Sequence, residues 1–178
     1  MSNYTETLNN YKVLNEAATS RAVVFFGTDW LCDIPVAELT RDSGIDAAVY
    51  NRSLKGLTLK DSQQVVDTCV NDLHPDKVFI NIGENDICCN DFDPAEFSEK
   101  FEWLLYTINA KCRCNIYILS VINDKGGLVN EILKKIAEKY GCEYIDIQAC
   151  RTSFLKFFSK VRFFLRCNPI TFYEAMNL

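Results

Sequence analysis

The hydrophobic positions of this sequence fall into two alternating patterns, one typical of buried strands and one typical of amphipathic helices. Short runs of β-branched, aliphatic and aromatic side chains predict strands, and these runs cover residues 21–26, 45–50, 77–82, 115–121 and 143–147. Apolar side chains spaced three or four residues apart predict helices, and these segments cover residues 4–18, 33–39, 57–73, 94–110 and 127–140. Strands and helices that alternate in this way are typical of a parallel sheet with helices on both faces.

Local signals mark several helix ends. Asp33 and Thr58 are residue types that cap helix N-termini, and Pro35 fits the first turn of the helix that we expect to begin at Asp33. Gly141 follows the last predicted helix, where glycine often ends a helix. The 178 residues show no internal repeat or linker, so we expect one domain over residues 1–178. The predicted fold class is α/β, a three-layer α/β/α sandwich around a five-stranded parallel sheet.

The composition of the chain bears on its cellular location and on whether it binds a metal ion. No apolar run approaches the roughly 20 residues of a membrane span, and residues 1–11 are too polar for a signal peptide, so we expect a cytoplasmic protein. The cysteines number nine, which is odd, and reduced thiols are expected in that compartment. A single histidine in the chain argues against a metal site, so we expect no metal and no cofactor, with the cysteines acting as small buried hydrophobic residues.

Charge is distributed unevenly along the chain. Residues 1–150 hold 14 lysines and arginines against 23 acidic residues, which argues against nucleic acid as a partner. Residues 151–167 instead combine five phenylalanines with five cations and no acidic residue. Three interpretations fit this segment: its phenylalanines fill the core, they form a face for a protein partner or a second copy, or they lie on a membrane. The membrane is the least expected of the three.

Polar loops follow two of the predicted strands and are candidates for a functional site. Gly27, Thr28 and Asp29 end the first run, and residues 83–86, Gly-Glu-Asn-Asp, end the third. In an α/β sheet, ligands bind outside the carboxyl ends of the strands. These loops therefore predict a site at that edge of the sheet.

The stretches over residues 49–58 and 74–87 resemble the SGNH, or GDSL-type, hydrolase family of esterases and acylhydrolases. Residues 83–86 resemble the family's Gly-x-Asn-Asp block, which follows the third strand. The resemblance extends over nearly the whole chain. It implies a flavodoxin-like fold and, for an active member, O-acyl esters of sugars or lipids as substrates.

The family's four blocks can be matched to this sequence residue by residue. Asp29 stands where the family has its nucleophilic serine. Gly56, through its backbone N–H, and Asn85, through its side-chain amide, match the two donors that stabilise the oxyanion. Asn168 matches the position of the catalytic histidine. The resemblance therefore implies a site built from Asp29, Gly56, Asn85 and Asn168 that lacks both the serine and the histidine.

This altered set of residues changes the expected function. A serine nucleophile needs an adjacent base, and the only histidine, His74, precedes the third strand, at the end of the sheet opposite Asp29. A carboxylate at position 29 would occupy the oxyanion donors itself. We therefore expect an impaired hydrolase that binds a ligand or partner. The alternative is an ester or O-acyl hydrolase in which Asp29 attacks and Asp33 or Asp86 activates water, although Asp86 is expected mainly to brace its own loop.

Overall fold

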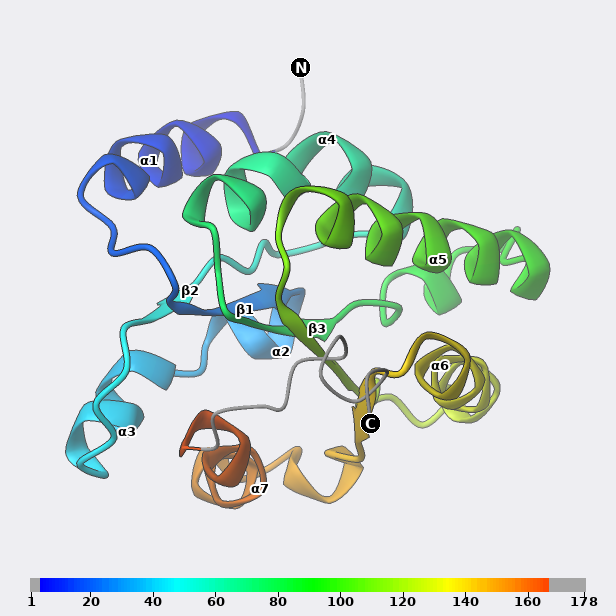
Figure 1. Cartoon of the computed structure of the whole chain (residues 1–178). Helices are drawn as coiled ribbons and strands as arrows, with labels where there is room; N and C mark the ends of the chain where they lie inside the picture. Colours follow the sequence, from blue (N-terminus) through cyan, green and yellow to red (C-terminus); the bar gives the residue numbers. More distant parts are fainter. Residues whose placement is uncertain (1–3, 167–178) are drawn as a thin grey trace, which may run out of the picture.

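The computed structural model describes residues 4–166, and its centre is a parallel sheet with the strand order β2-β1-β3-β4-β5 (Figure 1). The strands are β1 (Val23–Gly27), β2 (Val49–Asn51), β3 (Lys77–Asn81), β4 (Asn115–Leu119) and β5 (Glu143–Ile145). This is the order of flavodoxin-like, doubly wound sheets. The predicted fold class is confirmed.

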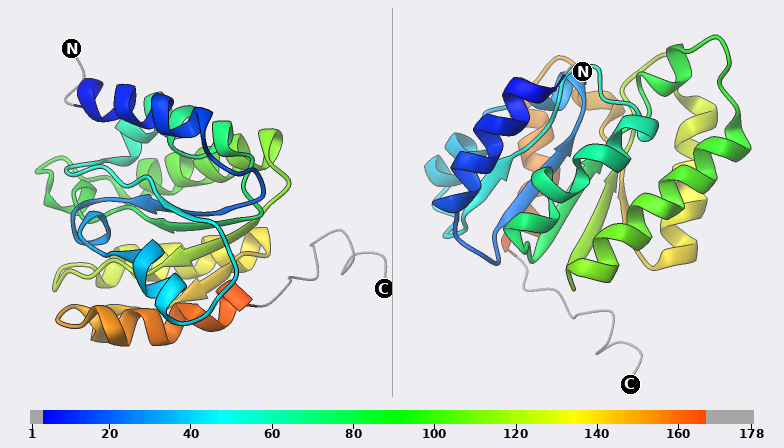
Figure 2. Two further views of the ribbon diagram at one scale, coloured as in Figure 1. Left: turned by 90° about the vertical axis from the view of Figure 1, so that its left-hand side faces the viewer. Right: turned by 90° about the horizontal axis from the view of Figure 1, so that it is seen from above.

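Helices cover both faces of the sheet (Figures 1 and 2). One layer holds α1 (Thr5–Glu16), α4 (Leu59–Cys69), α5 (Pro94–Lys111) and α6 (Gly127–Tyr140). The other layer holds α2 (Asp29–Cys32), α3 (Val36–Asp42) and α7 (Phe154–Arg166). Short 3-10 turns η1 (Asn71–Leu73), η2 (Asp86–Cys88) and η3 (Gln148–Cys150) complete the described elements. No helix of residues 4–166 combines the length and apolarity needed to cross a membrane.

The central strands are buried on both faces, which explains their continuous apolar runs. Along β1, Val24 and Phe26 pack under the α4–α5 layer, whereas Phe25 packs under the α3–α7 layer. Phe25 stacks on Phe79 at 4.6 Å between ring centroids, and Phe79 stacks on Tyr117 at 4.5 Å. This aromatic row ties β1, β3 and β4 together beneath α7.

The structure corrects the predicted start of the second helix. The segment after β1 forms the short helix α2 from Asp29, and the predicted helix over 33–39 begins only at Val36. Pro35 occupies the residue before α3, because proline lacks the N–H that a helix interior needs. Two other predicted helix ends are confirmed. The Thr58 side chain caps α4 by accepting a hydrogen bond from the Asp61 N–H, and Gly141 ends α6 with a φ of 65°.

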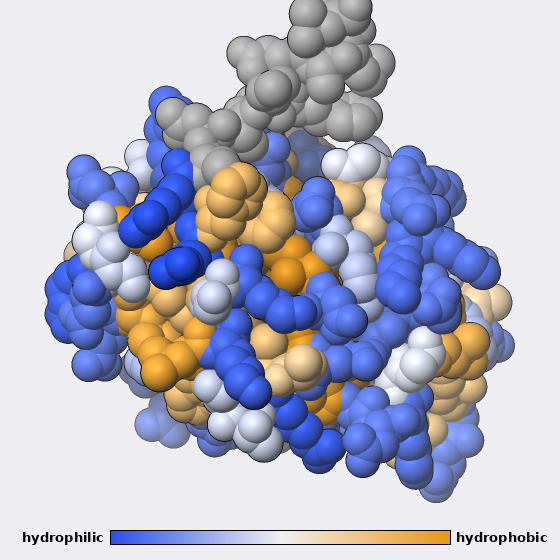
Figure 3. All heavy atoms as spheres, turned by 90° about the horizontal axis from the view of Figure 1, so that it is seen from below, coloured by the Kyte–Doolittle hydropathy of each residue, from blue (hydrophilic) through white to orange (hydrophobic). Residues whose placement is uncertain are grey.

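The basic, phenylalanine-rich segment forms α7, and its phenylalanines divide between the core and the surface. Phe157 and Phe158 are buried, whereas Phe163 is 64% exposed and Phe154 is 39% exposed. Figure 3 shows the face of the molecule seen from below in Figure 1, where apolar side chains lie among hydrophilic ones. Core packing thus explains part of the segment and leaves a mixed apolar and cationic surface.

Candidate functional site

The first part of the site is the turn between β1 and α2. Gly27 is required where β1 meets β3, since a Cβ at this position would lie 2.4 Å from the carbonyl oxygen of Asn81. Two residues later, Asp29 begins α2 with a φ of 23°, a conformation that is rare for residues other than glycine. Strained residues of this kind cluster at functional sites. The turn therefore holds the Asp29 side chain in one position at the edge of the sheet.

Three donors converge on the Asp29 carboxylate. The Thr28 hydroxyl and the Asn85 amide each donate to Oδ2 at 2.6 Å, and the backbone N–H of Gly56 donates to Oδ1 at 3.3 Å. The structure thus brings together Asp29, Gly56 and Asn85. The two groups that the resemblance matches to oxyanion donors both donate to this carboxylate of the protein itself.

These contacts set the charge of Asp29. Partial burial acts to raise the pKa of Asp29, but hydrogen bonds from Thr28, Asn85 and Gly56 outweigh it and hold the pKa below its ordinary value of 3.8. Hydrogen bonds to the charged form of a carboxyl favour that form. Asp29 is therefore an anion at neutral pH.

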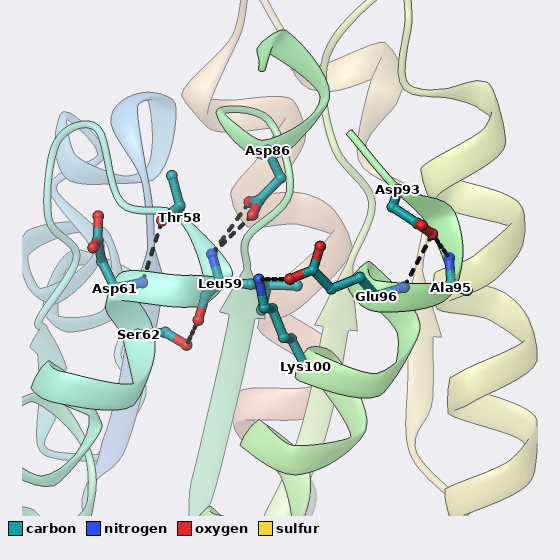
Figure 4. Close-up of polar contacts among 9 residues, drawn as sticks. All are labelled: Thr58, Leu59, Asp61, Ser62, Asp86, Asp93, Ala95, Glu96 and Lys100. Atoms are coloured by element: carbon teal, nitrogen blue, oxygen red, sulfur yellow. Dashed lines mark hydrogen bonds and ion pairs between the residues drawn. The ribbon is translucent and has the colours of Figure 1, made fainter. Parts of the chain in front are cut away.

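The loop after β3 is braced so that Asn85 reaches Asp29. The Asp86 carboxylate accepts a hydrogen bond of 3.0 Å from the Leu59 N–H at the start of α4 (Figure 4). Burial, the largest influence on this group, raises the pKa of Asp86. The prediction that Asp86 braces its loop is confirmed by this contact. Gly56 adopts a φ of 74°, and its carbonyl accepts a hydrogen bond of 3.0 Å from the Tyr4 hydroxyl.

The remaining sequence candidates lie elsewhere. Asn168 lies outside the described residues. His74 lies at the amino end of the sheet, where its carbonyl accepts a hydrogen bond from the Arg21 N–H two residues before β1. Asp33 forms an exposed ion pair of 3.1 Å with Lys55. The carboxylates proposed for water activation, Asp33 and Asp86, therefore already have partners.

Glu84 is a titratable group of this edge that the sequence did not single out. Burial raises the pKa of Glu84, and the negative charge of Asp29 raises it further, against the influence of Asn123 and Arg151. Two carboxyls whose environments push their pKa values apart are a common source of acid–base chemistry. Its only sequence signal is its place between Gly83 and Asn85, which says nothing about its burial.

Arg151 brings the loop before α7 to the same edge. Its guanidinium pairs with Asp124 at 3.2 Å, and its carbonyl accepts a hydrogen bond from the Trp30 indole at 3.2 Å. Among the residues that the structure describes, no three histidine, cysteine or carboxylate side chains are grouped to hold a metal ion. The polar groups of this edge therefore include carboxylates, the Asn85 amide, the Thr28 hydroxyl, the Lys55 ammonium and the Arg151 guanidinium.

Comparison with known proteins gives a fold but no close relative. No family model and no curated protein matches the sequence. A Streptococcus pneumonia protein whose name refers to platelet activating factor superposes with a TM-score of 0.71 at 18% identity, over 90% of this chain and 92% of that one.

Two further solved structures are of esterase and lipase types. A catalytic mutant of an acetylxylan esterase from Geobacillus stearothermophilus superposes with a TM-score of 0.60 at 18% identity, over 78% of this chain and 81% of that one. A GDSL-like lipase from Bacteroides thetaiotaomicron superposes with a TM-score of 0.62 at 15% identity, over 78% of this chain and 77% of that one. Together with the strand order and the placement of the Gly-x-Asn-Asp loop, these similarities show that the chain has the SGNH-type hydrolase fold.

Proposed function

We propose that this protein uses an SGNH-type fold to bind a ligand or partner and does not turn over esters. The observation that carries the proposal is the occupation of Gly56 N–H and the Asn85 amide by the Asp29 carboxylate. An ester carbonyl needs these donors when its oxygen becomes negative. In this protein they are already bonded to a fixed negative charge.

Occupation of these donors by Asp29 would raise the activation barrier for ester hydrolysis. Loss of one oxyanion donor lowers the rate of a serine hydrolase by roughly 100- to 1,000-fold. Here both donors are engaged, and the Asp29 charge would repel a developing oxyanion. Transition-state stabilisation is therefore weakened at the step where such enzymes depend on it.

The machinery for proton transfer supports the same proposal. Two solved structures of the Geobacillus esterase are catalytic mutants, one altered at a histidine and one at a serine. In this chain Asp29 follows β1, and the single histidine lies at the opposite end of the sheet. Without a base beside it, even a hydroxyl at position 29 would be a weak nucleophile.

Hydrolysis of p-nitrophenyl acetate and p-nitrophenyl butyrate tests the proposal. We expect the wild-type protein and the Asp29→Ala variant to hydrolyse both esters at the same rate, close to the buffer background. Robust turnover by the wild-type protein that Asp29→Ala abolishes would overturn the proposal and make Asp29 a nucleophile. Asp29→Ser serves as a control, because it restores the hydroxyl and still lacks a base.

A second candidate function is hydrolysis of O-acyl groups on sugars or lipids with altered machinery. The raised pKa of Glu84 beside the Asp29 charge favours it, because a carboxyl that holds its proton to higher pH is better suited to act as a general acid or base. Under this proposal, turnover of an acetylated sugar is lost in Glu84→Gln. No turnover of the acetylated sugar by the wild-type protein would exclude this function, whereas equal turnover by the wild-type protein and Glu84→Gln would exclude Glu84 as its acid or base.

The proposed partners follow from the same surface. From the resemblance to esterases we propose an ester or an acylated sugar as the small-molecule ligand. We propose α7 as the face for a second copy or a protein partner, since Leu155 and Phe163 are exposed beside Arg162. The thiols Cys69 and Cys112 are buried and act as small core residues. The chain has nine cysteines, and free thiols are typical of reducing compartments. We therefore propose a cytoplasmic location.

A further inference from the structure

A cavity of about 640 Å³, open to solvent on its outer side, lies next to the candidate site, at the β2 edge of the sheet. Its walls come from α1, from the first turn of α3 and the segment before it, and from the end of β2 with the loop that follows. Lining residues that the argument uses are Tyr4, Thr7, Tyr11, Cys32, Ser53 and Lys55. The volume is in the range of small-molecule sites in proteins, which are mostly about 300–1,000 Å³.

The cavity is continuous in sequence with the Asp29 site. Cys32 lies one helical turn after Asp29, and Lys55 directly precedes Gly56. Burial raises the pKa of the Cys32 thiol to about 11, and the charge of Asp29 contributes to the increase. An occupant of the cavity would therefore lie beside the residues that resemble an oxyanion hole.

Ser53 supplies an unpaired hydroxyl in the wall of this cavity. The residue is only 5% exposed, and its Oγ has no hydrogen-bond partner. Its backbone is fully engaged, because its N–H donates to the Asn51 side chain at 3.1 Å and its carbonyl accepts from the Tyr11 hydroxyl at 2.9 Å. A buried polar group without a partner is costly, so a ligand oxygen that reached this hydroxyl would satisfy it without breaking a hydrogen bond of the free protein.

The rest of the wall is apolar or uncharged for the most part. Ile34, Val36 and Leu54 present aliphatic side chains, and Tyr4 and Tyr11 present aromatic ones. Within the described residues, the charged side chains of the lining are Glu38 and Lys55, and Lys55 is paired with Asp33. Because Lys55 is neutralised by Asp33, Glu38 leaves the lining with one negative charge, which disfavours an anion, and the apolar rest of the wall favours an uncharged molecule.

The outer wall, α1, is attached in a way that allows it to respond to an occupant. None of the residues of α1 is fully buried. Its apolar contacts with the core come from the partly buried Leu8 and Tyr11. Side-chain hydrogen bonds add to them, including Tyr11 to the Ser53 carbonyl at 2.9 Å and Asn15 to the Thr68 carbonyl at 2.7 Å. Elements with few buried apolar contacts open at a low free-energy cost.

We propose that this cavity is a binding site for an uncharged, mainly apolar small molecule that carries a hydrogen-bonding oxygen. The Ser53 hydroxyl bonds that oxygen, the tyrosine rings and aliphatic side chains enclose the apolar part, and α1 closes over it. The inference deepens the proposed function, on whose ligand-binding half it rests, by naming where the ligand lies and what chemistry it has.

Titration with Nile red, an uncharged apolar fluorophore with one carbonyl, tests the site. We expect the wild-type protein to bind it with increased emission. Thr7→Trp places a large side chain in the cavity from the exposed face of α1 and weakens binding at least tenfold. Asn9→Trp, on the same helix but outside the lining, is the matched control and binds as the wild-type protein does.

Ser53→Ala separates the hydroxyl from the shape of the cavity. We expect binding to weaken by about five- to tenfold, the effect of one hydrogen bond. The melting temperature stays equal or rises, because no hydrogen bond of the free protein is lost. The matched control is Ser62→Ala, which removes a buried hydroxyl that donates to the Leu59 carbonyl at 2.7 Å. This control lowers the melting temperature and leaves binding unchanged.

The outcomes separate this inference from the proposed function. The cavity site is overturned if the wild-type protein does not bind Nile red. It is also overturned if the wild-type protein, Thr7→Trp and Ser53→Ala bind it equally well. Neither result affects the proposed absence of ester turnover. Ester hydrolysis by a wild-type protein that also binds Nile red in this pattern overturns the proposed lack of turnover and leaves the cavity site standing.

Discussion

The side-chain amide of Asn85 donates a hydrogen bond of 2.6 Å to the Asp29 carboxylate, and this bond closes the gap between the loops after β1 and β3. The two strands are neighbours in the sheet, with Gly27 in register with Asn81. The loops after these two strands thus hold the Asp29 carboxylate against the Asn85 amide, one of the two groups that the resemblance matches to oxyanion donors. This contact is the basis of the proposed binding role.

The first prediction concerns pH and Asp29. Its pKa in the folded state lies below the ordinary value of 3.8, so the folded protein binds this proton less tightly than the unfolded chain does. Asp29 therefore adds stability above that ordinary pKa, and the contribution is lost as the pH falls through the lowered pKa. Urea unfolding should show Asp29→Asn less stable than the wild-type protein at pH 7, with the gap narrowing below about pH 4. The exposed Asp46→Asn variant is the control and should show no such narrowing.

Asn85→Ala tests the donor side of the same contact. Removal of the amide takes away one of the hydrogen bonds that hold down the pKa of Asp29. We expect the pKa of Asp29 to rise towards its ordinary value, as measured by NMR titration of the carboxyl carbon. The fold should lose about 1–2 kcal/mol, a typical cost for a charge-assisted hydrogen bond. An unchanged pKa would show that Thr28 and Gly56 alone set the charge state.

Lys77 is the subject of the third prediction, because it is a buried cation that binds the end of α7. Its ammonium donates to the carbonyls of Phe164 and Leu165 at 2.8 and 3.1 Å. Cations near helix C-termini are favourable. Lys77→Met keeps the aliphatic stem and should lower the unfolding free energy by about 1–3 kcal/mol. Hydrogen exchange should rise first in the last turn of α7, whereas exchange uniform across the chain would contradict a local role.

Sequence patterns predicted most of the sheet and helices, for physical reasons that can be named. The helix over 127–140 was found with its observed ends, because its apolar spacing is regular and Gly141 ends it in a left-handed conformation. The strand over 45–50 is shorter in the structure, Val49–Asn51, since an edge strand pairs on one side only. The α2 helix was missed, because four residues are too few for a periodic pattern.

The site shows where sequence reasoning reaches its limit. The meeting of Asp29, Gly56 and Asn85 was expected from the resemblance, and the hydrogen bonds among them follow that expectation. The raised pKa of Glu84 and the unpaired hydroxyl of Ser53 depend on burial by residues distant in the chain. No local pattern encodes such burial.

The last prediction separates the two faces of α7. Phe157 is fully buried and packs edge-on against Trp30 at 5.2 Å between ring centroids, whereas Phe163 is 64% exposed. Phe157→Ser should therefore destabilise the fold by about 3–5 kcal/mol, the range of large-to-small core substitutions. Phe163→Ser should change stability by less than about 0.5 kcal/mol, as surface substitutions do.

Association is then measured on Phe163→Ser, whose fold is intact. If α7 is an interface for a second copy, sedimentation velocity shows a wild-type dimer that Phe163→Ser converts to a monomer at an unchanged melting temperature. Arg162 and Lys156 beside it would add an electrostatic share that weakens as salt rises. If the wild-type protein stays monomeric at every protein and salt concentration measured, self-association through α7 is ruled out. Phe163 would then be an exposed side chain that does not mediate dimer formation.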